Sequence, residues 1–282
     1  TYNPEPALFT RALSACILAA KQVPGTEVLV VDNNSSPPVE LSENDEMQVK
    51  VVRENRPGLA FARIAATRAS SGEVVVFADD DNVLDQDYLT ALRDLLDQHR
   101  SVAAWGPGII HPEFLGNGPK WISKDFSALY QGRSSAQTEF GSEAAWPPYY
   151  PSGSGLAVKR KILDAYADAV TNGELTCTGR KGDSLASAED AQIVWIAVKM
   201  GYAAGTSPAL RLVHVITERK QSLRYLRSLQ YNIARSYYSA LTEMFPEKRQ
   251  EMAALYAFCR EVDDVADDES RFGPDHGFAA LV

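Results

Sequence analysis

Short apolar runs and amphipathic stretches alternate along the first part of the chain. Residues 6–21 carry apolar side chains near one face at helical spacing, and residues 27–32 form an apolar run that ends at Asp32. Residues 48–53 alternate as in a short strand, and residues 59–70 again predict a helix. This alternation indicates an α/β fold with a parallel sheet and right-handed crossovers.

The most informative run covers residues 74–77 and leads to Asp79, Asp80 and Asp81. Because the run is short and rich in valine, it predicts a strand buried on both faces. Open α/β sheets bind ligands at the carboxyl ends of such strands. Three adjacent carboxylates repel one another unless a cation compensates, so they predict a site for Mg²⁺ or Mn²⁺ and a diphosphate. The alternative is an acidic turn that caps a helix beginning near Leu84.

The second half of the chain is less regular. Helices are predicted for residues 87–99, 160–170 and 191–200, and strands for residues 102–108, 156–158 and 210–215. Residues 109–150 lose the pattern and contain prolines and aromatic residues, which favours a segment that faces a ligand. Because the chain opens with a loop and a helix, we expect the sheet to have lost its first strand.

Composition narrows the class of protein. The 282 residues are 45% hydrophobic and 23% charged, which is ordinary for a globular protein with one large core. The net charge of −9 argues against a nucleic-acid partner. Three widely spaced cysteines indicate free thiols in a reducing cytoplasm. No stretch reaches the ~18 apolar residues of a membrane span. Peripheral association with the inner face of the membrane stays open.

Several motifs occur in an order that resembles family 2 glycosyltransferases. They are Thr1-Tyr2-Asn3, Val31-Asp32-Asn33-Asn34-Ser35, Asn55-Arg56-Pro57-Gly58 with Arg63, Asp79-Asp80-Asp81-Asn82, and Ala188-Glu189-Asp190. The resemblance covers residues 1 to about 228. It implies a GT-A fold, with a mixed and mostly parallel sheet flanked by helices. It also implies inverting transfer of a sugar from a nucleotide-diphosphate sugar, with a UDP-sugar favoured, to a saccharide, lipid-linked or small-molecule acceptor.

The resemblance further implies roles for individual residues. Those matching donor-binding positions are Thr1, Tyr2, Asn3, Asp32, Gly58, Arg63, Asp79 and Asp80, with Tyr2 and Asp32 at the nucleobase and Asp79 at the ribose. Asp81 matches the metal ligand of the Asp-x-Asp motif, and His214 stands where many GT-A enzymes place a later one. Asp190 matches the general base, with Glu189 beside it.

Plainer interpretations exist for several of these residues. A single histidine on an apolar strand is more often part of the core than a ligand. Glu189 and Asp190 could serve only to stabilise a helix amino terminus, which contributes ~0.3–1 kcal/mol. Arg180 and Lys181 could cover a diphosphate as a lid or be solvated. A module that binds a nucleotide sugar without turnover is the alternative to an active transferase.

The last part of the chain predicts only helices. Residues 232–241 and 255–264 resemble the opening of squalene and phytoene synthases, whose first aspartate-rich motif binds Mg²⁺ on a prenyl diphosphate. Here that motif is matched by Asp263 and Asp264, and Asp267 and Asp268 follow. No second such motif occurs, so the resemblance implies a truncated or fused segment; the alternative is an acidic, solvated helix end. We expect two regions, residues 1–228 and an all-α tail, residues 229–282. The tail carries apolar residues, Tyr237, Tyr238, Leu255, Tyr256 and Phe258, and should dock loosely on the first region, self-associate or stay mobile.

Overall fold

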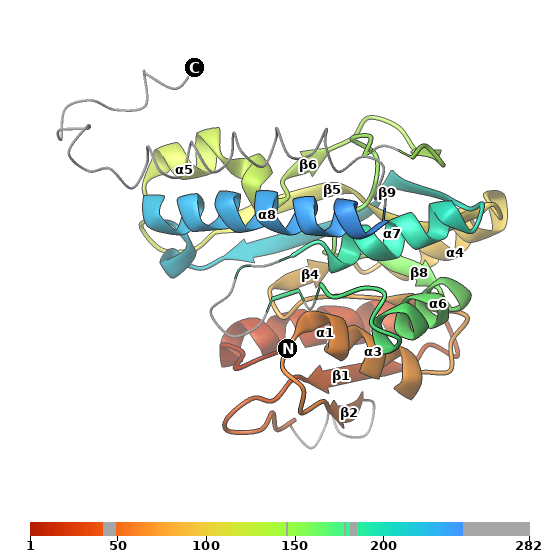
Figure 1. Cartoon of the computed structure of the whole chain (residues 1–282). Helices are drawn as coiled ribbons and strands as arrows, with labels where there is room; N and C mark the ends of the chain where they lie inside the picture. Colours follow the sequence, from red (N-terminus) through yellow and green to blue (C-terminus); the bar gives the residue numbers. More distant parts are fainter. Residues whose placement is uncertain (42–48, 145, 178, 181–184, 186, 245–282) are drawn as a thin grey trace.

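The computed structural model describes the chain except for residues 42–48, 145, 178, 181–184, 186 and 245–282 (Figure 1). The helices are α1 (Pro6–Lys21), α3 (Leu59–Ala69), α4 (Tyr88–Gln98), α5 (Lys120–Asp125), α6 (Arg160–Thr171), α7 (Glu189–Lys199) and α8 (Leu223–Met244), with 3-10 turns η1 (Ser127–Tyr130) and η2 (Glu218–Lys220). The strands are β1 (Val28–Asp32), β2 (Val49–Arg53), β3 (Val74–Val76), β4 (Asn82–Leu84), β5 (Val102–Phe114), β6 (Arg133–Ser134), β7 (Glu139–Gly141), β8 (Ala157–Lys159) and β9 (Ala203–Ile216). The mixed α/β architecture is confirmed.

The strands form two sheets. β1 and β2 pair in parallel, and a second sheet has the order β3-β8-β5-β9-β4, with β6 on β5 and β7 on β9. Among the described strands only β1–β2 and β5–β9 are parallel, and the other five pairings are antiparallel. The expected mixed sheet is confirmed, and its longest pairing, β5–β9, is parallel. The antiparallel pairings are short, because the irregular second half of the chain adds short returning strands rather than complete βαβ units.

Strand β3, which leads to the three aspartates, differs from expectation. Val74, Val75 and Val76 are half-buried rather than buried on both faces. In the described part of the chain, β3 pairs only with β8, and β1 pairs only with β2. A cavity lies between β1 and β3, so the valines of β3 contact protein on one side and the cavity on the other.

Polar contacts hold the two sheets together at both ends of this opening. The amino group of Thr1 donates to the carbonyl of Val31 at 2.8 Å. The carbonyl of Thr1 accepts from the amide of Asn33 at 2.9 Å, and its hydroxyl contacts the carboxylate of Asp80. At the other end the Glu27 carboxylate accepts from the amide of Gly72 at 3.1 Å. The spacing of β1 and β3 thus depends on a few side-chain and terminal contacts.

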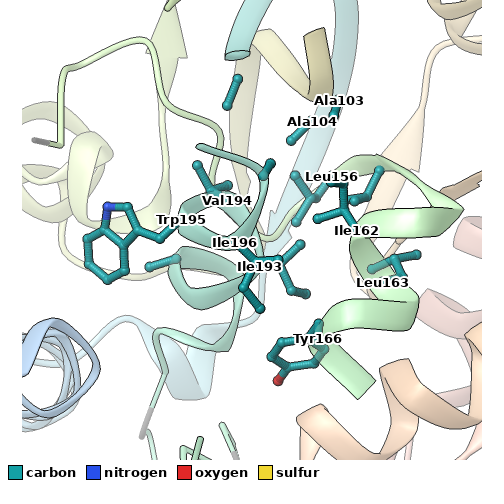
Figure 2. Close-up of a cluster of buried hydrophobic side chains, with 14 of the residues drawn as sticks. Ala103, Ala104, Leu156, Ile162, Leu163, Tyr166, Ile193, Val194, Trp195 and Ile196 are labelled. Carbon is teal, nitrogen blue, oxygen red and sulfur yellow. The ribbon is translucent and has the colours of Figure 1, made fainter. Parts of the chain in front are cut away.

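The main core lies between α6, α7 and the second sheet. Figure 2 shows Ile193 of α7 turned toward Ile162 and Leu163 of α6, while Trp195 points the other way. Trp195 contacts the ring of Trp146 with centroids 5.2 Å apart. Because α7 is buried on nearly all sides, its first residues are held firmly beside the cavity.

Helix α8 runs without interruption across the predicted boundary at residue 228 (Figure 1). Its Leu229, Ala240 and Met244 are buried, and Tyr237 packs on Trp146 with ring centroids 5.7 Å apart. Tyr237 is therefore packed against the loop before β8, and the loose docking of the tail as a whole stays a prediction. Leu255, Tyr256 and Phe258 lie outside the described residues, and the division into two regions stays a prediction.

Candidate functional site

One cavity of 1420 Å³ brings together most of the predicted site residues. It begins between β1 and β3 and extends to the amino end of α7 and the end of β9. The predicted residues that line it are Thr1, Tyr2, Asn3, Arg63, Asp79, Asp80, Asp81, Glu189, Asp190 and His214. Residues more than 200 positions apart in sequence therefore share one surface, as an α/β sheet with ligand-binding strand ends predicts.

Asp32 and Gly58 do not line the cavity, although both shape its edge. The buried Asp32 carboxylate accepts from the amides of Ser35 at 2.9 Å and Val39 at 3.1 Å, and it pairs with Arg53. Burial acts against ionisation, but these contacts lower the pKa of Asp32. The amide of Gly58 donates to the side chain of Asn33 at 2.9 Å. Asp32 thus holds the loop after β1, and Gly58 joins that loop to α3.

The three aspartates point to different partners. Asp80 contacts the Thr1 hydroxyl, and Asp79 and Asp81 flank it on the same turn. The Asn82 amide donates to the Asp79 carbonyl at 3.0 Å, which closes the turn. Burial and the neighbouring charge of Asp81 raise the pKa of Asp79, although Arg63 acts in the opposite direction. A cation at this turn would relieve the repulsion between the carboxylates.

Asp81 is the best-connected of the three. Its Oδ2 lies 2.7 Å from Nζ of Lys220 and 3.5 Å from Nε2 of His214, and its Oδ1 accepts from the Asn82 side chain at 3.0 Å. Burial works against ionisation, yet the contacts with His214 and Lys220 hold the pKa of Asp81 well below its ordinary value. Asp81 is therefore an ionised carboxylate at a position where positive groups gather.

His214 reaches the cavity from β9, opposite Asn82 of β4 in the antiparallel register. Its Nδ1 lies 2.9 Å from the carbonyl of Tyr130, which can only accept a hydrogen bond. Nδ1 therefore carries a proton, and Nε2 is the ring nitrogen that faces Asp81. A histidine that donates to a backbone carbonyl through one nitrogen is typical of a metal ligand.

A buried charge cluster occupies the other side of the cavity. Nη2 of Arg63 lies 3.4 Å from Oε1 of Glu189, and Arg63 also faces the ring of Phe77 at 5.1 Å. Burial alone would lower the pKa of Arg63, but the charges of Glu189, Asp190 and Asp79 raise it. Desolvation raises the pKa of Glu189 to about 7. Oδ1 of Asp190 accepts from the amide of Ala191 at 2.8 Å.

The donor set at Asp81 fits a divalent ion only in part. Within the described ranges no group of three or more His, Cys, Asp or Glu side chains could hold a metal. Asp81, in the turn just before β4, and His214, on the neighbouring strand β9, supply two ligands. Divalent ions at phosphate-transferring sites are often held by one or two protein groups, with substrate phosphates as further ligands. The residues therefore fit an ion that binds together with a diphosphate.

Three important residues were not among the predicted site residues. Lys220 contacts Asp81, Tyr130 holds His214, and Gly153 lies so close to Arg63 that an added Cβ would be 2.7 Å from Nη2. Lys220 could have been found from its place just after the histidine strand, but nothing in the local sequence marks Tyr130 or Gly153. Arg180 lines the cavity, whereas Lys181, Asp263, Asp264, Asp267 and Asp268 lie outside the described residues.

Comparisons with known proteins agree with this geometry. The family model described as Glycosyl transferase family 2 matches residues 1–165, and that of Squalene/phytoene synthase matches residues 232–279. Comparison with curated proteins gave no match. In the described part of the chain, no helix combines the length and apolar character required to span a bilayer.

Two solved structures show the fold. Mannosyltransferase PcManGT from Pyrobaculum calidifontis, in complex with GDP-Man and Mn²⁺, is 19% identical with a TM-score of 0.56, over 94% of this chain and 71% of that chain. S. aureus TarS is 16% identical with a TM-score of 0.51, over 94% of this chain and 52% of that chain. At these identities the likeness concerns the fold, and it confirms the expected GT-A architecture.

Proposed function

Since the chain belongs to glycosyl transferase family 2 and is a glycosyltransferase, we propose that it moves a sugar from a nucleotide-diphosphate donor to an acceptor hydroxyl with inversion, with a divalent ion and with Asp190 as general base. The observation that carries this proposal is the opening of Asp81, His214 and Asp190 onto one cavity. In that arrangement a diphosphate can bind near Asp81 and His214 while an acceptor binds near Asp190.

The two sides of the cavity have different tasks. Asp79 and Asp80, with Thr1, Tyr2 and Asn3 across the opening, bind the nucleoside part of the donor. Asp81 and His214 would hold the ion, which would supply positive charge against the negative charge of the departing diphosphate. His214 favours Mn²⁺, because Mg²⁺ is bound mainly through oxygen ligands.

Asp190 takes part in the bond exchange. As the acceptor oxygen forms its bond to the anomeric carbon, the bond from that carbon to the diphosphate oxygen breaks, and the diphosphate leaves with the electron pair. The acceptor proton passes to the Asp190 carboxylate. Displacement in a single step inverts the anomeric centre. Glu189 pairs with Arg63. This pair keeps the positive guanidinium group next to the Asp190 carboxylate and orients that carboxylate.

Titration calorimetry tests the proposal directly. UDP and GDP are titrated into the protein with and without Mn²⁺. We expect one of them to bind, and Mn²⁺ to strengthen its binding. If a folded sample binds neither nucleotide under either condition, the proposed donor class is wrong. If it binds the nucleotide but neither hydrolyses nor transfers a sugar from any donor, the alternative of a binding module without turnover is correct.

The proposal keeps residues 229–282 as a separate region resembling the start of a prenyl synthase. A UDP-sugar donor, an acceptor that is a saccharide, a lipid-linked or a small molecule, and a cytoplasmic location with optional contact to a membrane surface remain the predictions.

A further inference from the structure

The contact between Lys220 and Asp81 places a positive charge of the protein at the expected position of the ion. Nζ of Lys220 lies 2.7 Å from Oδ2 of Asp81, a normal distance for a charge-assisted hydrogen bond. The Lys220 side chain is only 16% exposed, and that of Asp81 12%. Such a contact is well shielded from water, so it is not equivalent to a surface ion pair.

The same oxygen of Asp81 is approached by a second side chain. Nε2 of His214 is 3.5 Å away, and the other ring nitrogen, Nδ1, lies 2.9 Å from the carbonyl of Tyr130. The Lys220 ammonium therefore lies at the same carboxylate oxygen that the His214 ring faces, which is where an ion held by Asp81 and His214 would bind.

The backbone of Lys220 is fixed while its side chain can move. The hydroxyl of Tyr130 donates to the Lys220 carbonyl at 2.6 Å, and the Lys220 amide donates to the carbonyl of Thr217 at 3.0 Å. The four-carbon stem of a lysine has several rotatable bonds, so the ammonium group can leave Asp81 without any change in η2. Tyr130 thus supports both His214 and Lys220.

An ammonium group and a divalent ion cannot share one carboxylate oxygen without strong repulsion. Asp81 and His214 alone supply too few ligands to displace Lys220 in the free protein. A diphosphate changes this balance, because its oxygens offer further ligands to the ion and a new negative partner to the released lysine. Arg180 and Arg219, which line the same cavity, add to the positive charge near such a partner.

We propose that Lys220 occupies the cation position of the free enzyme and gives it up to a divalent ion only when the donor diphosphate binds, so that ion and nucleotide enter as a coupled pair. This inference rests on the proposed function. It adds a residue that sets the order of binding and that excludes the ion from the empty site. By linkage, the nucleotide must strengthen ion binding by the same factor as the ion strengthens nucleotide binding.

Electron paramagnetic resonance of Mn²⁺ measures the ion directly, with no transfer reaction. Free and bound Mn²⁺ are counted for the full chain with and without UDP or GDP. The variants are Lys220→Met and Lys220→Gln, and Lys120→Met is the matched control because it removes one positive charge from exposed α5. Lys220→Gln keeps a hydrogen-bond donor for Asp81, so it remains informative if Lys220→Met unfolds.

The wild-type protein and Lys120→Met should bind Mn²⁺ weakly alone and about tenfold or more tightly with the nucleotide, on the scale of one charge-assisted hydrogen bond. Both Lys220 variants should bind Mn²⁺ without nucleotide about tenfold more tightly than wild type, and lose most of the coupling. If they bind Mn²⁺ as weakly as wild type while the coupling persists, this inference is overturned and the proposed function stands. If no protein binds Mn²⁺ under any condition, the metal-dependent function fails as well.

Discussion

The guanidinium of Arg63 lies 3.4 Å from the carboxylate of Glu189, and both side chains are buried. Despite this contact, desolvation raises the pKa of Glu189 from 4.5 to about 7. The folded protein then keeps a proton at pH values where the unfolded chain has lost it. The free energy of unfolding should therefore fall as pH rises from about 4.5 to about 7, by at most about 1.4 kcal/mol per pH unit from this group.

Urea denaturation across this pH range checks that prediction. Glu189→Gln cannot ionise, so its free energy of unfolding should lack the component that falls between pH 4.5 and 7. Exposed Glu174→Gln is the control, and it should follow the wild-type slope. Equal slopes for wild type and Glu189→Gln would show that Glu189 is ionised in the folded state.

A second prediction separates the ion site from the base. Asp81→Ala removes the carboxylate that faces His214 and Lys220, so metal-dependent nucleotide binding should be lost. Asp190→Asn keeps the size of the side chain and leaves the Asp81 contacts in place. It should bind nucleotide within about twofold of wild type and lose 10²-fold or more in kcat, which is the scale of general-base catalysis. Comparable loss of nucleotide affinity in both variants would contradict this division of roles.

Gly153 provides a third prediction. An added Cβ would lie 2.7 Å from Nη2 of Arg63 and 3.3 Å from Oδ2 of Asp190. Gly153→Ala should shift these flexible ends, lower kcat/KM about tenfold or more, and leave the melting temperature nearly unchanged. Gly72→Ala is the control, because its Cβ would meet only the carbonyl oxygen of Val74, at 3.3 Å. Equal activity of the two variants would show that the space at Gly153 is not needed.

Helix α8 contributes a buried side chain to the apolar cluster that contains Tyr130. Leu226 is buried in a cluster with Ile122, Tyr130 and Ile216, and Tyr130 in turn holds His214. Leu226→Ala should lower the free energy of unfolding by about 2–5 kcal/mol in urea denaturation. Leu18→Ala, at a side chain that is 49% exposed, should change it by less than about 0.5 kcal/mol. A small effect of Leu226→Ala would indicate that α8 is not an integral part of the domain.

The sequence predicted the elements that depend on local pattern and on motif order. Helix α1 has the expected bounds, and the predicted site residues from Thr1 to Asp190 line one cavity, apart from Asp32 and Gly58. The environment of β3 could not be predicted, because the half-burial of Val75 depends on which strand lies beside it. The contact of Tyr130 with His214 was equally hidden, since it is made by the backbone carbonyl of Tyr130, which every residue has. The predicted boundary at residue 228 falls inside α8, because the change in composition near Ser222 does not reveal that the helix is continuous.

The separation of β1 from β3 has a mechanical consequence. Asn33 and Thr1 lie on one side of the opening, and the turn from Asp79 to Asp81 lies on the other. In the described residues, no continuous ladder of backbone hydrogen bonds joins these two sides. A nucleotide that contacts both sides would link the two sheets. The empty enzyme should then yield most easily along this line, and the substrate itself would supply the stiffness that the sheet lacks there.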